Sequence, residues 1–292
     1  MSGFHGQPTR QVSSQFVQLE VLEQAGPRIV RLRFRDSANL LAEAPDFVIP
    51  TSFGNYHMWG GHRLWHAPEA MPRTYYPDDE GNIISELQDG LLLEGRIEPH
   101  TGMRKSIEVR LAGDRPVVRL VHTLSNHGNQ VAELAPWAIT QLRLGGVVIA
   151  PMPVGNSDPH GLLPNRQFSL WPYTRIRDSR LHWDDDFLLF KAEAGLPPFK
   201  IGYFNPHGWL AYWTEGILFR KIFRVSSAAS HPDGNCNAEI YCNDRFVELE
   251  SLAPLARIAP GEQVQAEETW EIFAGLEQAG LKDVIGRITQ LT

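Results

Sequence analysis

Residues 55–66 combine the side chain types that a sugar-binding site needs. The segment reads NYHMWGGHRLWH and holds three histidines, two tryptophans, a tyrosine and an arginine. Aromatic rings stack on the apolar C–H face of a pyranose, while histidine and arginine hydrogen-bond its hydroxyl groups. Arg63, Trp65 and His66 are therefore candidate ligand contacts. The alternative is an aromatic core with satisfied histidines, and the residue types leave both open.

A metal site is the competing interpretation of this segment. His62 and His66 lie four residues apart, a spacing that brings two ligands together on a helix. Gly60 and Gly61 directly precede them and disfavour a helix, so no metal site is expected. The glycine pair would let a ligand or another strand approach the backbone closely.

A second group of polar residues falls in residues 235–250. Asn243 and Asp244 look like a two-residue hairpin turn, which would pair Glu239 with Glu248 and Asn237 with Glu250. One face would then carry all of these acids, and like charges facing each other are unfavourable unless a function gathers them. Crowded carboxylates raise one another's pKa, which suits a general acid or base. A solvated outer face is the alternative.

Lys221 shares strand parity with Ile217, Phe219 and Phe223. A lysine in an apolar run is costly unless its ammonium group finds a partner. We expect it either to reach the carboxylates of residues 235–250 or to extend to water.

The elements that must position these side chains are strands. Short runs alternate between apolar and polar residues, as in Ile107, Val109 and Leu111, and glycine- and asparagine-rich turns separate them. The pattern predicts an all-β protein, and no alternation of strands with helices suggests a parallel sheet. One short helix is expected at about residues 280–291, because apolar residues recur there at intervals of three and four. We expect a single domain over residues 1–292, with a core at about 15–275.

The composition excludes several classes of function. The net charge of −7 argues against binding nucleic acid through phosphates. No apolar run approaches the length of a membrane span, and residues 1–10 lack the apolar core of a secretory signal. Only two cysteines occur, Cys236 and Cys242, and the predicted hairpin does not pair them. These features favour a cytoplasmic protein with free thiols. We expect it to be a monomer or homodimer.

Three stretches of the sequence resemble the aldose epimerase, or galactose mutarotase-like, superfamily. They are GGHRLW at residues 60–65, VRLVHTLSNHGNQVAELAPWAITQL from residue 118, and ELESLAPLARIAPGEQVQAEETWEIF at residues 248–273. The resemblance is strongest to a branch of unassigned function. It implies a large antiparallel β-supersandwich with a concave face that holds a sugar.

The resemblance also implies residue roles. The superfamily's epimerases use a glutamate base and a histidine acid to open and close the sugar ring, and the base position corresponds to Glu250. The acid position falls at about Trp137, which cannot donate a proton usefully. We therefore expect weak or absent epimerase activity unless a nearby histidine, His57, His62 or His66, replaces the acid.

Two functions follow from these observations. One is a sugar mutarotase or epimerase with Glu250 as the base; the other is a carbohydrate-binding protein without chemistry of its own. In either case we expect a small-molecule carbohydrate as ligand and no cofactor. The expected pocket holds Glu250, Glu248 and His62 as candidate catalytic groups, with these substrate contacts: Arg63, Trp65, His66, Trp137, Lys221, Asn237 and Glu239.

Overall fold

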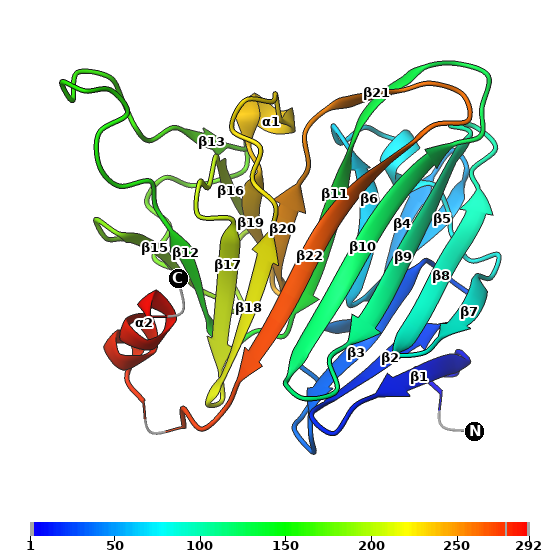
Figure 1. The fold of residues 1–292 in the computed structure, drawn as a ribbon, viewed down its shortest axis with the longest axis horizontal. Coiled ribbons are helices and arrows are strands. Elements are labelled where there is room, and N and C mark those ends of the chain that lie inside the picture. Colours follow the sequence, from blue (N-terminus) through cyan, green and yellow to red (C-terminus); the bar gives the residue numbers. More distant parts are fainter. Residues whose placement is uncertain (1–2, 278, 291–292) are drawn as a thin grey trace.

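Two large antiparallel sheets, each of ten strands, form the body of the protein (Figure 1). They are seen in a computed structural model that describes residues 3–277 and 279–290. A separate two-stranded hairpin, β4 (Glu43–Thr51) and β5 (Gly54–Gly60), accompanies them. The architecture confirms the predicted all-β antiparallel sandwich.

The first sheet, called the front sheet below, carries most of the residues singled out in the sequence. Its order is β1 (Thr9–Ser13), β2 (Val17–Leu22), β3 (Arg28–Phe34), β6 (His62–Ala67), β11 (Ala132–Leu142), β20 (Val247–Leu252), β19 (Ala238–Cys242), β16 (Phe199–Tyr203) and β13 (Phe168–Leu170), with β21 (Ala256–Ile258) paired to β11. The central strands therefore come from widely separated parts of the chain.

The second sheet, the back sheet, is built mainly from hairpins. Its order is β14 (Leu181–Trp183), β15 (Phe187–Lys191), β12 (Val147–Pro151), β17 (Trp209–Thr214), β18 (Ile217–Phe223), β22 (Gln263–Phe273), β10 (Val117–Asn126), β9 (Met103–Leu111), β8 (Gly90–Ile97) and β7 (Ile83–Leu87). Strand β9 shows the predicted alternation, because every second residue along it is buried. Its Ile107 and Val109 join Leu19 and Leu249 of the front sheet in one core between the sheets.

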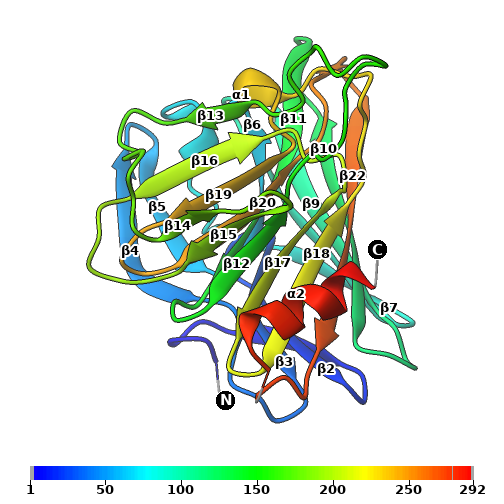
Figure 2. The same ribbon diagram turned by 90° about the vertical axis from the view of Figure 1, so that its left-hand side faces the viewer.

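Helical structure in the described residues is short. A 3-10 turn, η1, spans Arg73–Tyr75, and α1 spans Pro232–Asn235. Helix α2, Leu281–Thr289, is the predicted C-terminal helix; its predicted end at residue 291 lies outside the described residues. Val284 and Ile288 pack on Trp209 and Leu218 of the back sheet. Figure 2 shows α2 beside β17 and β18. In the described part of the chain, no helix has the length and hydropathy needed to cross a bilayer.

Gly60 and Gly61 turn the chain from β5 into β6. Both have positive φ, +94° and +75°, a region that side chains rarely adopt. A Cβ at Gly60 would lie 2.1 Å from the carbonyl oxygen of Ala42, and one at Gly61 would lie 2.0 Å from that of Ile29. The sequence left open whether a ligand or a strand approaches this pair, and the structure places backbone there.

The hairpin of residues 235–250 differs from the prediction in its register. Cys242 pairs with Val247 and Glu239 with Glu250, so the loop has four residues, 243–246, rather than two. The Asn243 side chain accepts hydrogen bonds from the backbone of Arg245 and Phe246 and so stabilises the wider turn. Because the pairing moves by two residues, every strand residue keeps its predicted face.

Candidate ligand-binding site

The outer face of the front sheet, which points away from the back sheet, gathers aromatic and charged side chains. Successive residues of a strand point to opposite faces, so each central strand contributes every second residue. The strand pairings align these residues across the sheet: Arg63 and Trp65 from β6, Trp137 and Gln141 from β11, Glu248 and Glu250 from β20, Glu239 and Tyr241 from β19, and Lys200 from β16.

A cavity of about 410 Å³ lies over this face. Hairpin β4–β5 borders it with Phe47, Ile49 and Met58. Segments outside the sheets add Glu69, Tyr75, Trp171 and Tyr173. We call this cavity the pocket; its size falls in the range of small-molecule sites.

Glu248 is the carboxyl group of the front sheet that lines the pocket. Its Oε1 accepts hydrogen bonds from Arg63 Nη2, at 3.1 Å, and from Gln141 Nε2, at 2.8 Å. Its Oε2 accepts no hydrogen bond from any of the described residues. Burial raises the pKa of Glu248 to about 7; Glu250 adds to the rise, and Arg63 opposes it. A carboxyl group with this pKa can exchange a proton near neutral pH.

Glu250 lies below the pocket surface and is fully buried. Its Oε2 accepts hydrogen bonds from Trp137 Nε1, at 2.7 Å, and from Lys200 Nζ, at 3.1 Å. Its Oε1 is buried without a hydrogen-bond partner in the described part of the chain. The resemblance implies an acid at the position of Trp137 and a base at the position of Glu250. In this structure the Trp137 indole donates a hydrogen bond to the Glu250 carboxylate.

Lys200 joins the carboxylates to the aromatic walls. Its Nζ lies 2.8 Å from Glu239 Oε2, and it is 4.7 Å and 4.6 Å from the ring centroids of Trp137 and Trp171. Burial favours the neutral amine, but Glu239 and Glu250 outweigh it and hold the pKa of Lys200 well above its usual value. Burial and Glu250 raise the pKa of Glu239, although Lys200 opposes them.

A hydrogen bond and a ring contact fix the orientation of Trp65 on β6. Trp65 Nε1 donates to Tyr56 Oη at 2.9 Å, and its ring meets that of Trp137 edge to face, with centroids 5.4 Å apart. The guanidinium group of Arg63 lies over Trp65, 4.2 Å from the ring centroid. Arg63 Nε and Nη1 are buried and have no partner among the described residues.

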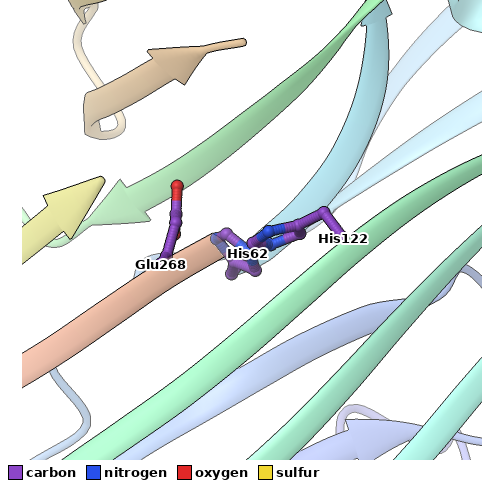
Figure 3. Close-up of side chains that lie close together, drawn as sticks. All are labelled: His62, His122 and Glu268. Carbon is purple, nitrogen blue, oxygen red and sulfur yellow. Dashed lines mark hydrogen bonds between the residues drawn. The ribbon is translucent and has the colours of Figure 1, made fainter. Parts of the chain in front are cut away.

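The predicted placement of His62 in this pocket is wrong. Arg63 and His62 are neighbours in one strand, so only one of them can face outward. His62 points between the sheets, where its Nε2 lies 2.7 Å from Nε2 of His122 on β10 (Figure 3). Burial, followed by the charges of nearby groups, holds the pKa of His62 well below its usual value. The His62 imidazole is therefore neutral, and it lies on the opposite face of the front sheet from the pocket.

Lys221 also faces the interior rather than the pocket carboxylates. Its Nζ lies 2.9 Å from Glu268 Oε1 on β22 and donates to Thr140 Oγ1 at 3.1 Å. We call His62, His122, Lys221 and Glu268 the interior cluster. Three of its members, His62, His122 and Glu268, offer metal-ligand atoms within 4.8 Å of one another. The Glu268 carboxylate, however, already pairs with Lys221 and accepts hydrogen bonds from Ser251 and Trp270, so both of its oxygens have partners.

Two further predicted contacts lie elsewhere. His66 lies four residues after His62 in the same strand and therefore also faces the interior, where its Nε2 is hydrogen-bonded to Glu98 Oε2 at 3.3 Å. Asn237 precedes β19, and its amide exchanges hydrogen bonds with the backbone of Asn205. Arg63, Trp65 and Trp137 do line the pocket, together with Glu248. Glu239 and Glu250 lie on the same face but beneath the surface.

Several pocket residues were not predicted. Lys200 lies between Phe199 and Ile201 in a short apolar run, the same signal that drew attention to Lys221. Gln141, which does not line the pocket but donates to Glu248, shares the strand parity of Trp137 and could have been found from it. Trp171 and Tyr173 belong to a segment without sheet alternation, and only tertiary structure brings them over the front sheet.

Comparison with known proteins supports the fold. The sequence matches no family model and no curated protein. Several solved structures are similar along most of the chain. A galactose mutarotase-like protein from Lactobacillus casei ATCC 334 is 9% identical, with 91% of this chain and 100% of that chain covered and a TM-score of 0.57. The fold is that of galactose mutarotase-like proteins.

Two proteins provisionally assigned as aldose 1-epimerases show the same likeness. The one from Escherichia coli K12 is 15% identical over 92% of this chain and 100% of that chain, with a TM-score of 0.57. The one from Klebsiella pneumoniae subsp. pneumoniae MGH 78578 is 10% identical over 99% and 85%, with a TM-score of 0.58. At these identities the likeness concerns the fold, and function has to be argued from the pocket.

Proposed function

We propose that this protein binds a monosaccharide or sugar derivative in the pocket on the outer face of the front sheet. The observation that carries the proposal is the combination of aromatic walls with buried, hydrogen-bonding charges around one cavity of about 410 Å³. Trp65, Trp137 and Trp171 offer apolar surface to sugar C–H groups, and Glu248 and Arg63 offer an acceptor and donors to hydroxyl groups.

Aldose mutarotation is the second candidate function, and one observation favours it. The pKa of Glu248, raised to about 7 by burial, gives the pocket a group that can take and return a proton. The base implied by the family resemblance is Glu250, but Trp137 and Lys200 cover it. Base chemistry at Glu250 would therefore require Lys200 to move, and we expect mutarotation to be slow or absent.

Calorimetric titration with a panel of monosaccharides tests the binding proposal. We expect saturable binding to the wild type and a large loss of affinity in a Trp137→Ala variant. Trp183→Ala is the matched control, because Trp183 is 47% exposed and does not line the pocket. A ligand at 100 times its Kd should also stabilise the protein by about 2.7 kcal/mol. Wild type that binds no sugar in the panel, or binding that survives Trp137→Ala, would contradict the proposal.

Polarimetry on fresh α-anomers separates the two functions. If the protein only binds sugar, it will change the optical rotation no faster than buffer. A rate above buffer that Glu248→Gln abolishes and Glu250→Gln preserves would assign the chemistry to Glu248. A rate lost only in Glu250→Gln would restore the base assignment that the resemblance implies.

A further inference from the structure

The carboxyl groups of the pocket floor outnumber the cations that pair with them. Glu239, Glu248 and Glu250 share one face, and in the described part of the chain Lys200 and Arg63 are the cations that form ion pairs with them. Lys200 is divided between Glu239 and Glu250, while Arg63 pairs with Glu248. All three acids are at least nine-tenths buried, so an unbalanced negative charge there is costly.

Unpartnered oxygen atoms mark the same imbalance. Oε1 of Glu239 and Oε1 of Glu250 are buried and accept no hydrogen bond within the described residues. Two donors of Arg63, Nε and Nη1, are also buried without partners among these residues, so the excess lies in charge, three carboxyl groups to two cations, and not in the number of hydrogen-bond acceptors. A protein can meet this excess with protons or with a cation supplied by a ligand.

Glu69, from a segment outside the sheets, also lines the cavity, but of the three acids of the pocket floor it is Glu248 that such a ligand can reach. It lines the pocket, and both of its recorded hydrogen bonds go to Oε1, which leaves Oε2 for a donor inside the cavity. The aromatic rings that border the cavity favour a cation as well, since their faces attract positive charge.

We infer that the pocket selects a sugar that carries an ammonium group, which donates to Glu248 Oε2 and supplies the missing positive charge. This inference rests on the proposed function, because it names the class of sugar that the same pocket takes. Sugar phosphates and sugar acids are disfavoured, since an anion would add to the excess of negative charge.

Proton release accompanies this binding. The groups that face or surround Glu248 are Arg63, Lys200, Glu250, Tyr75, Tyr241, Cys242 and Lys221. Burial and Glu250 outweigh the nearest cations and raise the pKa of Glu248 to about 7, so the carboxyl group is largely protonated at pH 6. An ammonium ligand stabilises the carboxylate and displaces that proton to the solvent.

Calorimetric titrations at pH 6 with four ligands test the inference: glucosamine, N-acetylglucosamine, glucose and glucose 6-phosphate. N-acetylglucosamine is the matched control, because it keeps the substituted ring and lacks the charge. We expect glucosamine to bind roughly 10- to 100-fold more tightly than either neutral sugar, as for a hydrogen bond to a charged group. Titrations in two buffers of different ionisation enthalpy should show release of a large fraction of one proton with glucosamine alone.

The variants Glu248→Gln and Glu193→Gln complete the test. Glu248→Gln keeps an acceptor for Arg63 and Gln141 and should remove both the preference and the proton release. Glu193 is exposed, and its replacement should change neither. If glucose binds as tightly as glucosamine, or glucose 6-phosphate binds more tightly, the inference fails and the proposed function stands. If none of the four sugars binds, the proposed function is contradicted as well.

Discussion

The front sheet carries a buried charged cluster on each of its faces, and the two differ in how completely they are satisfied. In the interior cluster, Glu268 binds Lys221, Ser251 and Trp270, and His62 binds His122. On the outer face, Glu248 and Arg63 border a cavity, and Glu250 and Arg63 keep buried atoms without partners in the described part of the chain. Saturated buried charges stabilise one arrangement, whereas unsaturated ones beside a cavity are available to a ligand.

Removing the interior cation should have the largest effect. Lys221→Met leaves Glu268 without its ion-pair partner, and breaking a buried pair costs about 3–5 kcal/mol. Urea denaturation at pH 7.5 measures this loss in the free energy of unfolding. Lys191→Met is the control, because Lys191 is exposed. Adding Glu268→Gln should recover part of the loss, and a double variant no more stable than Lys221→Met would show that the pair does not act as a unit.

The pocket carboxyl should make stability fall as pH rises. Because folding raises the pKa of Glu248 from 4.5 to about 7, the folded protein holds a proton that the unfolded chain releases between these values. The contribution lost over this window is at most about 3.5 kcal/mol at 1.4 kcal/mol per pKa unit. Unfolding of wild type and Glu248→Gln at pH 4.5, 6 and 7.5 measures it. The stability difference between them should change across the window; a constant difference would contradict the raised pKa.

The interior histidines should give the opposite pH dependence. Burial lowers the pKa of both His62 and His122, so the unfolded chain takes up protons that the folded protein excludes. Stability therefore falls as pH drops below 6.5. His62→Gln should make this acid-side loss shallower, at a cost of about 1–3 kcal/mol at pH 7.5 for the broken hydrogen bonds. His160→Gln, at an exposed position, should leave the profile unchanged.

Removing one aromatic wall should have the smallest effect on stability. Trp171 lies in a segment outside the sheets, so Trp171→Ala should cost less than about 1 kcal/mol in the free energy of unfolding. The same change should weaken sugar binding roughly tenfold, because it removes stacking surface. Thermal unfolding and calorimetric titration of one sample compare the two quantities. A loss of stability without a change in affinity would assign Trp171 to the fold alone.

Much of the fold follows from alternation along single strands. The outer-face acids Glu239, Glu248 and Glu250 were predicted together because they share parity, and a register error of two residues preserved that result. The same rule, had it been applied to β6, would have separated His62 from Arg63. Composition drew attention to the whole of residues 55–66, whereas a strand divides such a cluster between its two faces.

Other parts of the pocket depend on contacts that parity does not describe. The segment with Trp171 and Tyr173 reaches the front sheet through Thr174, whose Oγ1 donates to the Lys200 carbonyl oxygen and accepts from its amide. Nothing in the local sequence specifies this docking. The burial of Glu250 was not predictable either, because it requires Lys200 and Trp137 to come from two other strands.

The tryptophan walls also give the pocket an optical signal of its own. Three of the chain's eight tryptophans, Trp65, Trp137 and Trp171, border one cavity. Indole emission shifts to shorter wavelength when water leaves its surroundings, and a bound ligand would displace water from all three at once. Ligand occupancy of the unlabelled protein can therefore be followed by its intrinsic fluorescence.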